Sequence, residues 1–174
     1  MEERIQIGIY SDTHGYLDEG LIKDFKDCKE IWHAGDLGNM SVVEPWFKQG
    51  NLRAVYGNID GTDVRQYFPE HQFFHVQGFP VLMLHIAGRY PRYSDLGRKL
   101  IRELKPRMIV CGHSHICRVV KEDGILYTNP GAAGRHGFHK VRTALKIAFE
   151  NGKPVEVRAM ELGPRSDQFT GEGN

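Results

Sequence analysis

Short apolar runs rich in β-branched residues alternate with stretches of helical periodicity through the first two thirds of this chain. This alternation restricts the fold more than any other feature, because it is typical of an α/β domain with largely parallel strands. The predicted strands in this part are Ile5–Tyr10, Glu30–His33, Leu52–Tyr56, Phe73–Val76, Val81–His85 and Met108–Cys111. The predicted helices are Asp18–Phe25, Ser41–Gln49 and Ser94–Leu104, with Ser41 and Ser94 as N-caps and Glu44 completing a capping box.

The chain after Cys111 has the pattern of antiparallel strands. Asp123-Gly124 and Asn151-Gly152 favour tight hairpin turns, because both central residues of such a turn take positive φ. The predicted strands are Ile116–Val120, Ile125–Thr128, Val141–Phe149 and Val155–Met160. We therefore expect a second, more antiparallel sheet that packs against the first. Residues 1–162 are predicted to form a single domain, and the polar, glycine-rich residues 163–174 a flexible tail.

Length and charge describe one globular domain without a dominant surface charge. The 174 residues suffice for one core, and a net charge of +1 gives no broad basic surface for extended nucleic-acid binding. Three cysteines without paired spacing favour reduced thiols over disulfides. No apolar run is long enough to span a bilayer. We therefore expect a cytoplasmic protein without membrane association, and assembly into a homo-oligomer is compatible with this sequence.

Side chains that can bind metals follow five of the predicted strands. They lie in Asp12-Thr13-His14, Gly35-Asp36, Gly57-Asn58, at His85, and in Gly112-His113-Ser114-His115. In extended backbone, residues two apart point to the same side, so Asp12 and His14 can face one cation together. Open α/β sheets bind ligands at the carboxyl ends of their strands. These side chains are therefore expected to meet at one edge of the fold.

Each of these segments taken alone has a simpler structural explanation. Asp-x-His and Gly-Asp are common in turns, and a lone strand-end residue such as His85 is more often a packed core histidine. Their repetition at five strand ends favours a metal site, because independent turns and core histidines would rarely coincide in this way. Aspartate, asparagine and histidine donors without thiolate suit manganese, iron or zinc more than copper or calcium.

The order Asp-x-His, Gly-Asp, Gly-Asn, strand-end His and Gly-His-x-His resembles the calcineurin-like metallophosphoesterase superfamily. The short chain, Gly57-Asn58-Ile59-Asp60 and Asn129-Pro130-Gly131 are most similar to its small bacterial and archaeal phosphodiesterase branch, which includes the eukaryotic retromer scaffold subunit. The resemblance implies a four-layer α/β/β/α sandwich of two mixed β-sheets. It also implies one metal held by Asp12, His14 and His115, a second held by Asn58, His85 and His113, and Asp36 as the bridge between them.

The activity that the resemblance implies is hydrolysis of a small phosphodiester, or of a phosphomonoester, by a hydroxide that bridges two divalent metal ions. Manganese is favoured, with iron, zinc or nickel as alternatives. The predicted catalytic residues are Asp36, Asn58, Asp60 and His85. Asp60 could orient Asn58 or a neighbouring basic group, or it could equally close the turn with Gly61. The alternative is a non-catalytic metal-binding scaffold that works by protein contact. All seven ligand positions are filled, which favours the enzyme.

Two positions depart from the family pattern. Many members have a histidine after the motif asparagine, assigned to the leaving group, where this chain has Ile59, and His85 is followed by Ile86-Ala87 in place of Gly-His. We therefore hypothesise a preference for activated or diester substrates. Other residues have weaker expected roles: Arg65, Arg89, Arg135 and His136 as phosphate contacts or surface residues, His33 as a packed or ligand-supporting residue, and His71, His75 and His139 as structural or exposed residues.

Overall fold

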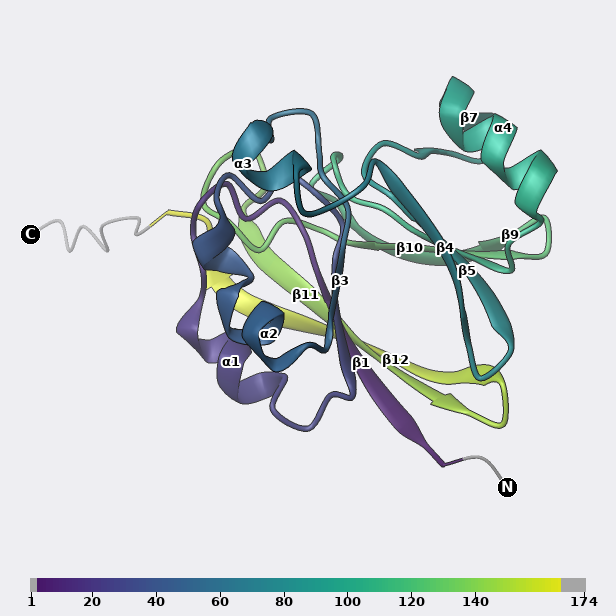
Figure 1. The fold of residues 1–174 in the computed structure, drawn as a ribbon, viewed down its shortest axis with the longest axis horizontal. Coiled ribbons are helices and arrows are strands. Elements are labelled where there is room, and N and C mark those ends of the chain that lie inside the picture. The colour runs from purple at the N-terminus through teal and green to yellow at the C-terminus, as the bar shows by residue number, and fades with distance from the viewer. Residues whose placement is uncertain (1–2, 167–174) are drawn as a thin grey trace, which may run out of the picture.

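Two five-stranded sheets lie face to face in the computed structural model, which describes residues 3–166 (Figure 1). The first sheet has the order β12 (Lys153–Pro164), β11 (Val141–Glu150), β1 (Ile5–Tyr10), β2 (Glu30–His33) and β3 (Leu52–Ala54). The second has the order β4 (His71–Val76), β5 (Phe79–Leu84), β8 (Met108–Val110), β10 (Ile125–Pro130) and β9 (Cys117–Glu122). The remaining elements are α1 (Glu19–Asp24), a 3₁₀-helix (Met40–Val42), α2 (Glu44–Gln49), α3 (Thr62–Arg65), α4 (Asp95–Leu104) and the hairpin of β6 (Gly88–Arg89) and β7 (Arg92–Tyr93).

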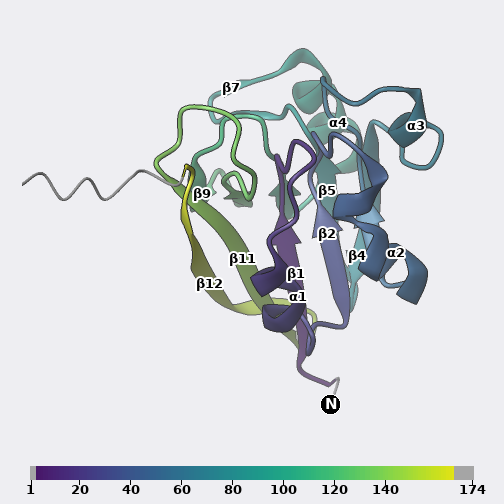
Figure 2. The same ribbon diagram turned by 90° about the vertical axis from the view of Figure 1, so that its left-hand side faces the viewer.

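Three clusters of buried apolar side chains hold the layers together. Between the sheets, Ile7 and Ile9 of β1 share a core with Val81 and Met83 of β5. Helices α1 and α2 cover the outer face of the first sheet, and α4 covers that of the second (Figures 1 and 2). Each sheet contains parallel and antiparallel pairs, such as β1 with β2 and β1 with β11. The predicted α/β/β/α sandwich of two mixed sheets is thus confirmed.

The predicted division of strands between the two sheets is wrong. Both hairpin turns form, and Asp123 and Asn151 have φ of 50° each. However, β11 and β12 join the first sheet beside β1, while β9 and β10 join the second beside β8. A turn dipeptide determines only that its two flanking strands pair. The sheet that they join depends on which distant strand covers their apolar face, and here Leu145 and Ile147 lie beside Ile9 and Ile7 of β1.

The predicted helix Ser41–Gln49 is divided into two elements. The side chain of Asn39, rather than Ser41, caps the 3₁₀-helix, and α2 begins at Glu44, so the predicted capping box does not form. The cause is Pro45, because a proline has no N–H and its ring collides with the carbonyl group four residues earlier, which belongs to Ser41. The other predicted cap is confirmed, since Ser94 Oγ accepts a hydrogen bond from the Gly97 N–H at 3.0 Å.

Strand β12 continues to Pro164, two residues past the predicted end of the domain. The buried Arg142 side chain donates hydrogen bonds to the carbonyl oxygens of Leu162 and Pro164 at 2.8 and 3.0 Å, which holds this end of the strand in place. The rest of the predicted tail, from residue 167 onward, lies outside the described residues. Within residues 3–166, no helix has the length and apolar character needed to cross a membrane.

Candidate metal centre

The five predicted ligand segments meet where strands β1, β2 and β3 of one sheet and β5 and β8 of the other end. The side chains form two groups: potential ligand atoms of Asp12, His14 and His115 lie within 4.8 Å of one another, and so do those of Asp36, His85 and His113. Asn58 lies beside the second group, with its Oδ1 atom 3.1 Å from His113 Nδ1. The tertiary structure therefore brings all seven predicted ligand residues together.

Asp36 lies between the two groups. Its Oδ2 atom is 3.5 Å from His14 Nε2 and 3.2 Å from His85 Nε2. Its Oδ1 atom accepts a hydrogen bond from the Ile59 N–H at 3.1 Å, which fixes the orientation of the carboxylate. Burial acts to raise the pKa of Asp36, but the neighbouring His85, the Ile59 N–H and His14 together lower it below its usual value. The carboxylate is thus ionised and has one oxygen directed at both groups.

Left-handed backbone, rather than extended backbone, gives the Asp-x-His and His-x-His pairs their common direction. Asp12 and His14 have φ of 53° and 45°, and His113 and His115 have φ of 69° and 59°. The expectation of an extended segment is therefore wrong for both pairs. Asparagine and aspartate enter this region more readily than other residues, and non-glycine residues held there are concentrated at functional sites.

Backbone contacts between loops hold these conformations. The Asp12 N–H donates to the Gly35 carbonyl at 3.0 Å, and the His14 N–H donates to the Asp36 carbonyl at 3.1 Å. The fully buried Asn129 side chain donates to the Gly112 carbonyl at 2.8 Å, which anchors the loop that carries His113. The ligand loops are thus positioned by one another before any ion binds.

The protonation of His85 indicates that a cation belongs beside it. Its Nδ1 atom is 2.7 Å from the Ala34 carbonyl oxygen, which can only accept, so Nδ1 carries the proton. In the neutral ring, Nε2 then presents a lone pair toward the carboxylates of Asp36 and Asp12, at 3.2 and 3.8 Å. Burial acts to lower the pKa of His85, but the carboxylates of Asp36 and Asp12 raise it overall. Positive charge is therefore favoured at this position.

Three buried atoms of the site that could bind a metal ion have no hydrogen-bond partner among residues 3–166. They are Asp12 Oδ1, His14 Nε2 and His85 Nε2. A buried polar atom without a partner costs about 1 to 3 kcal/mol, so several in one small space are unfavourable unless a ligand satisfies them. Hard oxygen and borderline nitrogen donors are those that first-row divalent cations prefer. The residues present therefore fit divalent metal ions.

Asp60 positions the loops and does not touch the ligands. Its buried carboxylate accepts hydrogen bonds from the N–H groups of Leu37, Gly38 and Gly57 at 3.1, 2.9 and 2.8 Å. It thereby ties the loop of Asp36 to the loop of Asn58. These contacts give Asp60 a role in positioning the ligand loops, in line with the expectation that it could orient Asn58.

His33 and the weaker phosphate-contact candidates have separate positions. His33 is fully buried, which lowers its pKa to about 3, and its Nδ1 atom accepts from the Gly35 N–H at 3.1 Å, so it supports the ligand loop as expected. Arg135 stacks on Tyr16, with its guanidinium carbon 4.6 Å from the ring centroid. The His136 ring stacks on His14, and exposed Arg89 lies on the β6 strand.

His139 is a residue that the sequence did not reveal as part of the site. Its Nε2 atom lies 2.9 Å from the Gly134 carbonyl oxygen and must donate there, so its Nδ1 atom accepts in the neutral ring. The His115 Nδ1 atom is 3.3 Å from His139 Nδ1 and is therefore the donor of this hydrogen bond. This leaves His115 Nε2 unprotonated, 3.2 Å from Asp12 Oδ1. These contacts keep His115 Nε2 unprotonated, and an unprotonated nitrogen is the form that can bind a metal ion.

Replacing His139 with alanine is expected to weaken the binding of a divalent cation by about 10- to 100-fold, as loss of a residue that orients a ligand typically does. The His139→Asn variant, whose Oδ1 atom can accept from His115 Nδ1–H, should recover part of this affinity. Calorimetric titration of metal-free protein measures both values, and nitrogen-15 NMR reports the ring form of His115. An alanine variant with unchanged affinity and unchanged His115 signals would contradict this role.

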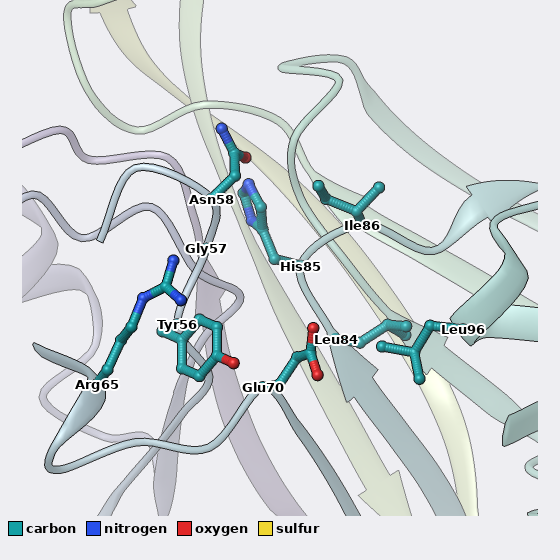
Figure 3. A pocket seen from close by; sticks show the side chains of 9 residues that line it. All are labelled: Tyr56, Gly57, Asn58, Arg65, Glu70, Leu84, His85, Ile86 and Leu96. Atoms are coloured by element: carbon teal, nitrogen blue, oxygen red, sulfur yellow. The ribbon is translucent and has the colours of Figure 1, made fainter. Parts of the chain in front are cut away.

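Two cavities open beside the site and share Asn58. One, of about 260 Å³, lies between the β3–α3 segment and the β5–α4 segment (Figure 3). The other, of about 530 Å³, extends over His14, Asp36 and His113. A ligand centred on the candidate metal residues would therefore have space on two sides.

Comparison with known proteins agrees with this geometry. A family model described as the calcineurin-like phosphoesterase superfamily domain matches residues 5–152. A "Probable metallophosphoesterase" of Methanothermobacter thermautotrophicus is 29% identical over 135 residues, which cover 72% of this chain and 76% of that protein. A solved structure of a novel archaeal phosphodiesterase is similar with a TM-score of 0.72 at 22% identity, covering 90% of this chain and 99% of that one. Vacuolar protein sorting 29 from Cryptosporidium parvum is similar with a TM-score of 0.70 at 19% identity, covering 93% and 100%.

At these identities, the two structural likenesses establish the shared fold alone. The family model reaches further, because its match begins at β1, ends in the turn between β11 and β12, and includes all seven candidate ligand residues. The chain therefore belongs to the calcineurin-like phosphoesterase superfamily.

Proposed function

We propose that this chain is a dinuclear metal-dependent phosphodiesterase, with phosphomonoesters as a second substrate class. The observation that carries the proposal is that three buried potential ligand atoms, Asp12 Oδ1, His14 Nε2 and His85 Nε2, have no hydrogen-bond partner among residues 3–166, in a chain of the phosphoesterase superfamily. The proposed residues for one ion are Asp12, His14 and His115, for the other Asn58, His85 and His113, with Asp36 contacting both. Manganese is the proposed metal, with iron, zinc or nickel as alternatives.

Divalent ions bound here would supply positive charge that stabilises phosphoryl oxygens and lowers the pKa of water. The protein's own groups provide the orientation. The Ala34 carbonyl holds His85 with Nε2 toward the centre, and the Ile59 N–H holds Asp36 so that Oδ2 faces His14 and His85. Because these loops are held by backbone contacts, little reorganisation is needed when a substrate phosphate enters.

Hydrolysis of bis(p-nitrophenyl) phosphate and of p-nitrophenyl phosphate by metal-free protein tests the proposal. We expect no turnover without metal, and turnover of the diester after addition of Mn²⁺. Zn²⁺ and Fe²⁺ added in separate assays rank the metals. Turnover that is independent of metal, or no turnover with any of the three ions, would contradict the proposed activity.

The side chain at position 59 predicts how turnover depends on the leaving group. Ile59 is 46% exposed at the cavity over the site and cannot donate a proton. We expect the rate to fall steeply as the pKa of the leaving group rises. The Ile59→His variant should raise kcat for esters of weakly acidic alcohols by about tenfold or more, because a positioned general acid contributes at least this much. A series of phosphodiesters that share one retained ester group and differ in the pKa of the leaving group measures this dependence. An equal slope of rate against leaving-group pKa in wild type and variant would contradict the prediction.

A non-catalytic metal-binding scaffold of the same fold is the second candidate. The structural similarity to vacuolar protein sorting 29 supports it. Calorimetry and the ester assays on the same sample distinguish the two candidates. Both would bind Mn²⁺, but a scaffold would turn over neither ester.

A further inference from the structure

The smaller cavity beside the candidate metal centre lies directly below two of the proposed ligands. Figure 3 shows Asn58 and His85 at its mouth, with Tyr56, Arg65 and Glu70 on one side and Leu84, Ile86 and Leu96 on the other. A phosphoryl group held beside Asn58 and His85 would have one of its ester oxygens at this opening. The group attached to that oxygen then extends into the cavity.

One wall of this cavity is apolar. Leu84 is buried at the end of β5, Leu96 lies on α4, and Ile86 is 40% exposed. Exposed aliphatic side chains beside a polar site provide a surface for the apolar face of a ligand. The volume of about 260 Å³ is sufficient for one ring.

The opposite wall is polar, and contacts with Asp60 and Tyr56 hold the Arg65 side chain in place. The Arg65 Nε–H donates to the Asp60 carbonyl at 2.6 Å, and its guanidinium carbon lies 4.3 Å from the centroid of the Tyr56 ring. The face of Tyr56 toward Arg65 is therefore covered, and its hydroxyl group points toward Glu70 and the open space (Figure 3). Since Asp60 also ties together the ligand loops, this wall is connected to the metal centre.

Glu70 is exposed and lines the cavity, and its carboxylate forms no hydrogen bond or ion pair within residues 3–166. An ionised carboxylate only accepts hydrogen bonds, so it selects a ligand with donors. Ammonium groups are disfavoured, because Arg65 and the proposed metal ions place positive charge beside the cavity. Neutral donors, among them hydroxyl groups, fit this position.

We propose that this cavity binds one ester substituent of the substrate, and that this substituent is a sugar. A sugar ring combines an apolar C–H face for Leu84, Ile86 and Leu96 with hydroxyl donors for Glu70 and an acceptor for Arg65. The inference rests on the proposed phosphodiesterase activity and deepens it by assigning the substrate class: a phosphodiester of a glycosyl or nucleoside group.

Two diesters with the same leaving group test this assignment. They are bis(p-nitrophenyl) phosphate and the p-nitrophenyl ester of uridine 5′-phosphate, which differ only in the group that stays. In the Mn²⁺-loaded protein, we expect Glu70→Gln to lower kcat/KM for the uridine ester by about tenfold relative to the bis-aryl ester, because a hydrogen bond to a charged group is lost. The Leu96→Trp variant, which fills the cavity, should lower kcat/KM for the uridine ester as well.

The matched control is Glu103→Gln, which removes the same charge from an exposed position near the far end of α4 and should leave both values unchanged. If Glu70→Gln leaves the ratio of the two diesters as in the wild type, or if Leu96→Trp leaves kcat/KM for the uridine ester unchanged, the sugar subsite is overturned while the phosphodiesterase stands. If the metal-loaded wild type hydrolyses neither diester, the proposed activity fails and the subsite fails with it.

Discussion

Asp36→Asn is expected to lower kcat/KM for bis(p-nitrophenyl) phosphate by about a thousandfold or more. The Asp36 carboxylate faces both ligand groups, with Oδ2 3.5 Å from His14 Nε2 and 3.2 Å from His85 Nε2. Asparagine keeps the shape and can still accept from the Ile59 N–H, but it removes the negative charge that two cations would share. Steady-state kinetics in Mn²⁺ and calorimetric titration of the metal-free variant measure the loss.

The control for this variant is Asp24→Asn, which neutralises an exposed aspartate at the end of α1. It should bind Mn²⁺ and turn over the diester as the wild type does. Circular dichroism should show the same fold for both variants, because Asn at position 36 leaves the backbone contacts of the loop in place. Full turnover in Asp36→Asn would exclude this residue from the centre.

Gly57→Ala is expected to destabilise the fold by about 2 kcal/mol or more and to abolish tight Mn²⁺ binding. A Cβ atom at Gly57 would lie 2.0 Å from Asp36 Oδ1 and 2.3 Å from the Asp36 backbone nitrogen. The backbone atom cannot rotate away, so the loop of Asp36 or the loop of Asn58 has to move. Either movement separates ligands that the fold brings together. Urea denaturation and calorimetric titration measure the two effects.

Gly61→Ala is the matched control on the same loop. A Cβ atom there would meet only the Asp63 Oδ1 atom at 3.2 Å, at the end of an exposed side chain that can turn away. We expect near wild-type stability and Mn²⁺ affinity. Equal behaviour of the two alanine variants would show that close approach of the two loops is not required.

The positions of the candidate ligands could be predicted because each follows a strand in the chain. Asp12, Asp36 and His85 come directly after apolar runs whose strand character is a local property. Parallel strands place their carboxyl ends at one edge, so residues from separate segments meet there. The metal-ligating side chains that follow these strands were therefore enough to predict a metal centre.

The supporting residues could not be predicted, because their contacts join distant parts of the chain. His139 reaches His115 across 24 positions, and Asp60 reaches Leu37 across 23. His139 has no sequence pattern that distinguishes it from an exposed histidine, and the sequence singled out Asp60 without showing which backbone groups it contacts. The left-handed backbone of Asp12 and His113 was missed for the same reason, since hydrogen bonds from other loops stabilise it.

By itself, the sequence determined the strands, the hairpin turns and the chemical type of each ligand, because periodicity, turn dipeptides and donor atoms are properties of short segments. The tertiary structure alone decided which sheet each hairpin joins, how Asp36 comes to face both His14 and His85, and which cavity opens beside Asn58. The physical reason is that burial of apolar faces and pairing of buried polar groups are satisfied by residues far apart in the chain.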